Sequence, residues 1–344
     1  MKIFSTWICI DERGDDSWFP ASGGLSSERR IQAIYWRALC VAFFSARLHN
    51  PDLRLVLFSN VAQLPEIDGI SIERTLSRLG VELRTTPFEH RTPPGYYGHW
   101  RNQFYEFSIF EYIKTSPDFA DDDLLLMVDS DCIITANLAP LYADIERFGA
   151  INCEIGYFTP RHIINGISRL DMMSIFEQLE GRAPCDIPKY YAGEFFAARV
   201  AQVAKIYDCF EQVWPQLLDR HSAGLPKFNE EAHTLSYIYW KLGLDNDNGG
   251  KYVKRMNTNP VVFRNTGPVD VQLPIWHLPL EKTTGLRRMF RLCARLGFDV
   301  QAIAPAAFNA RAGAVCNVVR IPARNKIYFA AQFAKTAFGK FFRS

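Results

Sequence analysis

Two aspartates, Asp129 and Asp131, directly follow the apolar run 124–128, with only Ser130 between them. Such a run is typical of a strand buried on both faces, and α/β sheets place ligand sites where these strands end. Two carboxylates this close repel each other unless a cation lies between them or one is protonated, and their oxygens suit Mg²⁺ or Mn²⁺. We therefore expect a divalent cation here that can bind a diphosphate. A helix cap or a solvated turn is the plain alternative.

A second group of reactive side chains, Glu230, Glu231 and His233, lies in a predicted helix over 229–242. Asn229 is a residue type that caps helices, and acidic residues are favoured in the first turn because they face the positive end of the helix dipole. Capping alone therefore also explains the two glutamates, and packing in the interior explains a lone histidine. Residue type leaves both interpretations open.

Alternating strand and helix patterns surround these residues. The sequence predicts strands over 2–10, 53–58 and 81–84, and a helix over 31–46 whose apolar residues recur at helical spacing. This order predicts an α/β fold in which helices flank a sheet. Three predicted strands precede 124–128, so the aspartate pair lies within the domain and not at its start.

An aromatic-rich stretch, 190–198, predicts a further strand and contains Gly193. A glycine inside a strand marks a place where another backbone or a ligand approaches closely. A helix over 200–217 follows.

The composition is that of a folded protein, with 48% hydrophobic and 22% charged residues among 344. The eight cysteines are scattered without a Cys-x-x-Cys pair, which predicts neither a zinc site nor a disulfide framework and favours the reducing cytoplasm. We expect no secretory signal and no membrane-spanning segment.

The net charge of +2 hides a basic C-terminal end, because residues 300–344 contain seven basic side chains and no acidic one. We expect one main domain over 1–285 and a basic helical extension over 286–344. Within 325–343, phenylalanines lie among cations, which favours an amphipathic helix on an anionic membrane surface, at its inner face. Packing of that helix on the domain is the alternative. The rest of the chain is not basic, so we expect no nucleic-acid partner.

Three segments resemble glycosyltransferases. The sequence Val128-Asp129-Ser130-Asp131 resembles the Asp-x-Asp signature of GT-A fold enzymes. Residues 190–196 and 229–233 are similar to two motifs of family 6, the retaining α-galactosyl and N-acetylgalactosaminyl transferases. The resemblance covers roughly residues 2–285, and each motif is weak by itself. It implies a GT-A type, Rossmann-like mixed sheet flanked by helices.

The resemblance also implies roles for single residues. Asp129 and Asp131 would bind the metal, Mn²⁺ or Mg²⁺, and with Ser130 the donor diphosphate. Glu230 matches an aspartate that holds the donor sugar, and Glu231 matches the catalytic glutamate beside the reacting carbon, a nucleophile or an electrostatic stabiliser. The acceptor would meet three residues: Gly193, Glu194 and His233. Glu194 stands where the family usually has an apolar residue, and Glu230 replaces a shorter side chain.

Residues 276–282 resemble the C-terminal histidine and lysine segment of family 8 glycosyltransferases, with one residue fewer between the two. The resemblance implies that His277 is a third metal ligand and that Lys282 contacts the diphosphate. A histidine packed beside Trp276 is the alternative. We also expect Arg101 to contact phosphate and Asp11 to contact the nucleotide, although both types are common in plain turns and at surfaces.

The leading hypothesis is a metal-dependent glycosyltransferase that transfers a hexose from a nucleotide sugar, with a UDP-sugar favoured and the configuration retained, to a glycan or lipid-linked acceptor, as in cell-surface polysaccharide synthesis. A haloacid-dehalogenase-like phosphatase with Asp129 as nucleophile is the runner-up. Its aspartates normally follow the first strand of the core, and the strands predicted before Asp129 argue against it. A catalytically silent glycan-binding protein of the same fold is the third hypothesis.

Overall fold

The computed structural model describes residues 1–156, 159–246, 248–259, 263–319, 327 and 330. A six-stranded sheet forms the centre, in the order β10-β11-β8-β1-β4-β7. Strands β1, β4, β7 and β8 run parallel, β11 pairs antiparallel with β8, and β10 pairs antiparallel with β11. The sheet is therefore mixed. The strands are β1 (Lys2–Ile8), β4 (Arg54–Ser59), β7 (Val81–Thr85), β8 (Leu124–Val128), β10 (Ala150–Ile151) and β11 (Phe195–Arg199).

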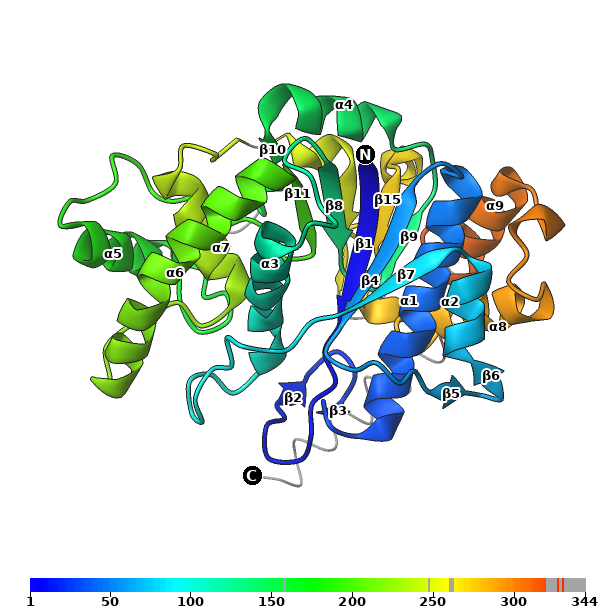
Figure 1. Cartoon of the computed structure of the whole chain (residues 1–344), viewed down its shortest axis with the longest axis horizontal. Coiled ribbons are helices and arrows are strands. Elements are labelled where there is room, and N and C mark those ends of the chain that lie inside the picture. The colour runs from blue at the N-terminus through cyan, green and yellow to red at the C-terminus, as the bar shows by residue number, and fades with distance from the viewer. Residues whose placement is uncertain (157–158, 247, 260–262, 320–326, 328–329, 331–344) are drawn as a thin grey trace.

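Helices cover both faces of this sheet (Figure 1). One face packs against α1 (Arg29–His49) and α4 (Ala139–Phe148), and α8 (Gly285–Arg295) packs on α1 in the same apolar cluster. The other packs against α3 (Tyr105–Thr115) and α6 (Val200–Ser222), and α5 (Arg169–Glu180) and α7 (Glu231–Lys241) belong to the same apolar cluster. The predicted fold class, a Rossmann-like mixed α/β sheet flanked by helices, is confirmed.

Strand β8 shows why the sequence before the aspartates is uninterruptedly apolar. All of its side chains are buried. Leu124, Leu126 and Val128 belong to one apolar cluster, and Leu125 and Met127 belong to the cluster on the opposite face. Because successive side chains of a strand point to opposite faces, a strand covered on both sides needs apolar residues at every position.

A second, three-stranded sheet has the order β12-β15-β9. It consists of β9 (Cys132–Ile134), β12 (Val253–Arg255) and β15 (Ile275–His277). The turn between β8 and β9 carries the aspartate pair, and β15 pairs antiparallel with β9 so that His277 lies opposite Cys132. This pairing brings a distant part of the chain to the end of β8.

The remaining elements are short or peripheral. They are helices α2 (Ile72–Arg78) and α9 (Pro305–Val315), the strand pairs β2 (Trp18–Phe19) with β3 (Gly24–Leu25), β5 (Glu66–Ile67) with β6 (Ile70–Ser71) and β13 (Thr258–Asn259) with β14 (Phe263–Arg264), and the 3₁₀ turns η1 (Arg101–Phe104), η2 (Gly249–Lys251), η3 (Pro268–Gln272), η4 (Pro279–Glu281) and η5 (Val300–Ala302).

The predicted strand 190–198 begins only at Phe195. Before it, the backbone N–H of Tyr191 donates to the hydroxyl of Ser236 in α7 at 3.0 Å, and the chain turns at Gly193 and Glu194. Residues 190–192 still pair with 153–155, through an antiparallel bridge at Tyr191 and Glu154 and through backbone hydrogen bonds. The turn at Gly193 and Glu194 separates this short pairing from β11.

No helix within the described residues is both long and apolar enough to cross a membrane. The predicted membrane-binding segment 325–343 lies outside the described residues, apart from Ile327 and Ala330.

Candidate active site

A cavity opens at the carboxyl ends of β1 and β8, where the sequence analysis expected a ligand site. Its empty volume, which includes space open to solvent, is about 1060 Å³. The lining combines apolar and aromatic side chains with convergent polar groups. The cavity lining contains these residues that the sequence predicted for the site: Asp129, Ser130, Asp131, Gly193, Glu194, Glu230, Glu231, His277 and Lys282.

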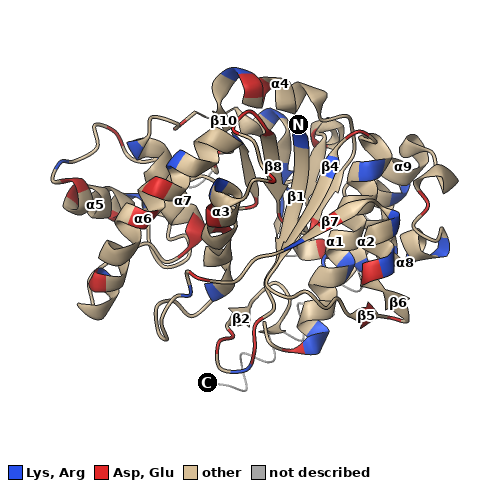
Figure 2. Ribbon diagram, viewed as in Figure 1, with Lys and Arg blue, Asp and Glu red and all other residues tan. Residues whose placement is uncertain are grey.

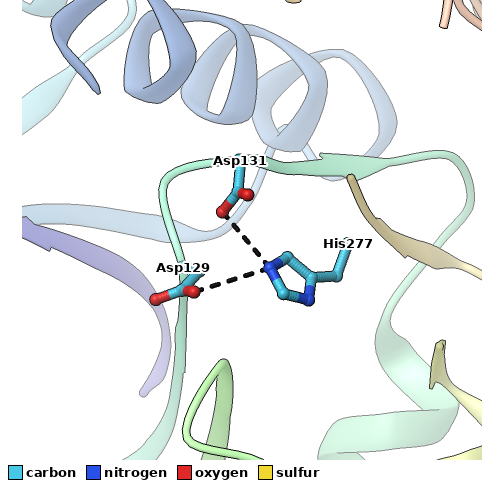
Figure 3. Close-up of side chains that lie close together, drawn as sticks. All are labelled: Asp129, Asp131 and His277. Carbon is cyan, nitrogen blue, oxygen red and sulfur yellow. Dashed lines mark ion pairs between the residues drawn. The ribbon is translucent and has the colours of Figure 1, made fainter. Parts of the chain in front are cut away.

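Asp129, Asp131 and His277 all line the cavity, and their side chains point toward one another (Figure 3). The Nε2 atom of His277 lies 3.5 Å from Oδ2 of Asp129 and 3.4 Å from Oδ1 of Asp131. All three candidate ligand atoms lie within 4.8 Å of one another. The aspartates come from the β8–β9 turn and the histidine from the end of β15, so pairing of β9 with β15 builds the cluster.

The chemistry of this cluster fits a divalent cation. Oδ1 of Asp131 and Nε2 of His277 are buried and make no hydrogen bond, whereas Oδ2 of Asp131 pairs with Lys282. Buried polar atoms without partners are rare in folded proteins, and a bound metal would satisfy them. Carboxylate oxygens and an imidazole nitrogen are ligands that Mn²⁺ accepts.

Glu194 contacts His277 at the ring nitrogen that does not face the two aspartates. Its Oε1 lies 3.0 Å from Nδ1 of His277, and its Oε2 lies 3.3 Å from Nη1 of Arg255. A carboxylate on the second ring nitrogen is the usual partner of a metal-binding histidine, because it fixes the ring and the tautomer. Burial would raise the pKa of Glu194, but Arg255 and His277 lower it to about 2. Although burial lowers the pKa of His277, Asp131 and Glu194 raise it to about 9.

Lys282 adds a buried cation beside the cluster. Its Nζ lies 3.1 Å from Oδ2 of Asp131 and 5.0 Å from the centre of the Tyr35 ring. The side chain is 11% exposed and lines the cavity. A lysine here can contact an anion that is bound to the metal cluster.

Glu230 and Glu231 form the facing part of the lining, at the start of α7. Glu230 accepts hydrogen bonds from the hydroxyl of Tyr190, at 2.6 Å, and from the side-chain amide of Asn165. Burial raises the pKa of Glu230 to about 7. Burial raises the pKa of Glu231 well above its ordinary value, and the nearby carboxyls of Glu230 and Glu106 add to the shift. Both glutamates therefore resist ionisation in this environment.

Gly193 makes room for Glu231. A Cβ atom at position 193 would lie 2.2 Å from Oε1 of Glu231. The other carboxyl oxygen, Oε2, is buried without a hydrogen-bond partner. The sequence expectation of a close approach at this glycine is met, and the approaching group is a side chain of α7.

Three expected site residues do not line the cavity. His233 is fully buried behind Tyr190, with the two ring centres 5.3 Å apart, and burial lowers its pKa to about 3. Asp11 is buried and accepts a hydrogen bond from the hydroxyl of Ser26 at 2.7 Å. The guanidinium of Arg101 donates to the carbonyl of Thr92 at 2.6 Å. The cavity instead meets the neighbours of these residues, such as Ile10 and Asn102.

Some residues of the cavity were not predicted. Arg255, Asn165, Gln32 and Tyr35 all line it, and none belongs to a motif noted in the sequence. The aromatic richness around 190–196 pointed to Tyr190, but nothing in the sequence marks Arg255. Its place follows from the parallel pairing of β12 with β15, which sets Arg255 opposite His277.

Comparisons with known proteins give structural likeness only. No protein family and no curated protein matches the sequence. The galactosyltransferase LgtC, in complex with donor and acceptor sugar analogs, is 14% identical with a TM-score of 0.46, over 95% of this chain and 100% of that one. Mouse xyloside xylosyltransferase 1, in its apo form, is 13% identical with a TM-score of 0.46, over 80% and 97%. An active-site mutant of LgtC is 15% identical with a TM-score of 0.46, over 80% and 86%. None of these comparisons supports the resemblance to family 6.

Proposed function

We propose that the protein is a metal-dependent GT-A type glycosyltransferase that transfers a hexose from a nucleotide sugar, with UDP favoured, to a glycan or lipid-linked acceptor. One observation carries the proposal: a single cavity joins the cluster of Asp129, Asp131 and His277 to the buried carboxyls of Glu230 and Glu231. Sugar transfer needs both groups, because negative charge grows on the leaving diphosphate while the sugar becomes oxocarbenium-like.

The metal cluster would stabilise the leaving group. Asp129, Asp131 and His277 would hold a divalent cation, Mn²⁺ or Mg²⁺, which neutralises developing charge on the diphosphate when it is bound. Lys282 contributes a fixed positive charge beside Asp131. Ser130, in the turn between the two aspartates, lines the cavity and can donate its hydroxyl proton to a phosphate oxygen.

The two glutamates would bind the sugar and stabilise its positive charge. Glu230, fixed by Tyr190 and Asn165, can hold sugar hydroxyls. Glu231 has a free carboxyl oxygen and is the proposed catalytic carboxyl beside the reacting carbon. Positive charge on the sugar favours the ionised form of this carboxyl, so its stabilising effect is greatest in the transition state, where it accelerates the reaction. Retention of configuration, implied by the family 6 resemblance, stays a prediction that NMR of the product anomer tests.

The thermal stability of the protein with nucleotides tests the proposal. UDP with Mn²⁺ should raise the melting temperature, and UDP with a chelator should not, because a ligand stabilises only the state that binds it. ADP and GDP, each with Mn²⁺, test the preference for uracil. A UDP-sugar should then be consumed in the presence of acceptor glycans. An equal UDP shift in chelator would contradict the metal-dependent mechanism.

The same assays distinguish the alternatives. A phosphatase would release phosphate from sugar phosphates and ignore UDP-sugars. In the structure, β1, β4 and β7 precede β8, so Asp129 does not follow the first strand of the sheet, as the phosphatase pattern requires. A silent glycan-binding protein would bind UDP without turnover.

A further inference from the structure

Helix α8 presents a row of arginines to solvent. Arg287, Arg288, Arg291 and Arg295 are exposed on α8, and Arg311 is exposed on the neighbouring helix α9. Figure 2 shows basic residues on both helices. A groove runs between the two helices, which we call the arginine groove: Arg288, Arg291, Arg295 and Arg311 line it together with apolar residues that include Leu292 and Val315.

Three of the four arginines that line this groove form no ion pair with a described residue. Arg291, Arg295 and Arg311 have no acidic partner within 4.0 Å among the described residues. The neighbouring acid Asp68 is held by Arg37, with Nη2 to Oδ1 at 2.9 Å. Three guanidinium groups are therefore available to an anion from outside.

The arginines do not stabilise the helix that carries them. Arg287 and Arg288 lie in the first turn of α8, where the helix dipole disfavours positive charge. Arg287 with Arg291, and Arg291 with Arg295, place like charges four residues apart, which destabilises a helix. Packing of the opposite face, through buried residues such as Met289 and Phe290 on α1, holds α8 in place instead. We therefore expect these arginines to contact a partner outside the helix.

We propose that the arginine groove binds the phosphate of anionic phospholipids and holds the protein on a negatively charged bilayer. Guanidinium groups bind phosphate through paired hydrogen bonds, and the apolar part of the groove suits the glycerol and upper acyl region of a lipid. The chain's own end does not complement the groove, because residues 320–344 contain six basic residues and no acidic one. The apolar part also disfavours a nucleic acid, and the net charge of the chain is only +2.

Vesicle sedimentation with the full chain tests this site. The protein should sediment with vesicles that contain about a third phosphatidylglycerol and remain in solution with pure phosphatidylcholine. The variant Arg291→Glu/Arg295→Glu should lower the partition coefficient at least roughly tenfold, since each basic residue near an anionic surface strengthens binding severalfold. Arg147→Glu/Arg161→Glu, which reverses two exposed arginines elsewhere, changes the net charge equally and should bind nearly as the wild type does.

Further samples distinguish lipid binding at the arginine groove from three alternatives: binding of free phosphate, binding of DNA, and membrane binding by another segment of the chain. The neutral variant Arg291→Gln/Arg295→Gln should lose binding partly, and circular dichroism checks that every variant is folded. Binding that survives Arg291→Glu/Arg295→Glu overturns the proposal and assigns membrane contact to another segment. Equal loss in the control pair, complete competition by inorganic phosphate at physiological concentration, or stronger binding to duplex DNA than to vesicles also overturns it. None of these samples measures sugar transfer, so the result is independent of the proposed function.

Discussion

Asp131 keeps its charge because of its neighbours. Burial alone would raise the pKa of its carboxyl, but Lys282 and His277 lower the pKa below its usual range. The residue is therefore a buried anion beside Lys282 and His277, and burying charged groups is costly unless function requires it. Its Oδ1 atom, buried without a hydrogen bond, points to the same conclusion.

Replacing Asp131 by asparagine should remove one ligand charge and keep the side-chain volume. We expect Mn²⁺ binding to weaken by at least roughly tenfold, because even the loss of a residue that supports a metal ligand weakens binding by that much. The additional thermal stabilisation by UDP in the presence of Mn²⁺ should disappear. Asp122→Asn, at an exposed position, is the matched control and should behave as wild type. An unchanged shift in Asp131→Asn would remove this residue from the metal site.

Glu230 should make the protein less stable above neutral pH. Its pKa in the folded state is about 7, above the ordinary value of 4.5, because burial penalises its charged form. The stabilising effect of the protonated carboxyl is fully present below pH 4.5 and is lost as the pH rises through 7. Glu230→Gln cannot ionise, so at pH 8 its free energy of unfolding should exceed that of the wild type by about 1–3 kcal/mol.

Urea unfolding at pH 8 and pH 5 measures this difference, which should shrink at the lower pH. Glu146→Gln, at an exposed position of α4, should show no such difference. Sugar transfer by Glu230→Gln should fall at the same time, since active sites trade stability for function. A Glu230→Gln variant that is less stable than wild type at pH 8 would contradict the burial argument.

Single residues were predictable where their type and their place at the end of an element coincide. Asp129 and Asp131 follow the end of a strand and Glu231 begins a helix, and all three line the cavity. Arg255 was not predictable, because its contact with Glu194 depends on which strands pair. Asp11 and Arg101 lie near the cavity, but the Asp11 carboxylate accepts a hydrogen bond from Ser26 and the Arg101 guanidinium donates one to Thr92. The sequence alone does not show which partner such a side chain binds.

At the scale of elements, the start of α7 and the segment before β11 work as one unit. The sequence predicted one continuous strand there because aromatic residues favour strands. Residues 190–192 do pair with 153–155, but a turn at 193–194 separates them from β11. The hydrogen bond from Tyr191 to Ser236 and the contact of Gly193 with Glu231 tie this segment to α7. The turn thus depends on tertiary contacts that local propensity does not contain.

Gly193→Ala tests this unit. The added Cβ would lie 2.2 Å from Oε1 of Glu231 and must displace it. We expect the initial rate of sugar transfer to fall by about 10²-fold, since small displacements of catalytic groups have effects of that size. The thermal shift with UDP and Mn²⁺ should persist, because the metal cluster lies on other elements. Gly250→Ala, where nothing lies within 4 Å of the new Cβ, is the control. Full activity in Gly193→Ala would show that the position of Glu231 is not critical.

At the scale of the whole molecule, the site joins two sheets. The parallel core was predictable, since β1, α1, β4 and β7 follow the strand and helix patterns of the sequence closely. The three-stranded sheet was not, because its strands are three residues long and come from distant segments. Only the resemblance of the segment around His277 pointed to a link with the aspartates.

A ligand that bridges this site should therefore make two separate parts of the chain more rigid together. We expect Mn²⁺ with UDP to slow hydrogen exchange in residues 129–134 and 275–282, because β9 and β15 share hydrogen bonds and carry the ligands between them. Helix α5, which contributes nothing to the cavity lining, should exchange as before. Hydrogen–deuterium exchange with mass spectrometry resolves these segments, and UDP without metal is the matched sample. Protection confined to residues 129–134 would mean that His277 does not complete the site, and the metal would then rest on the two aspartates alone.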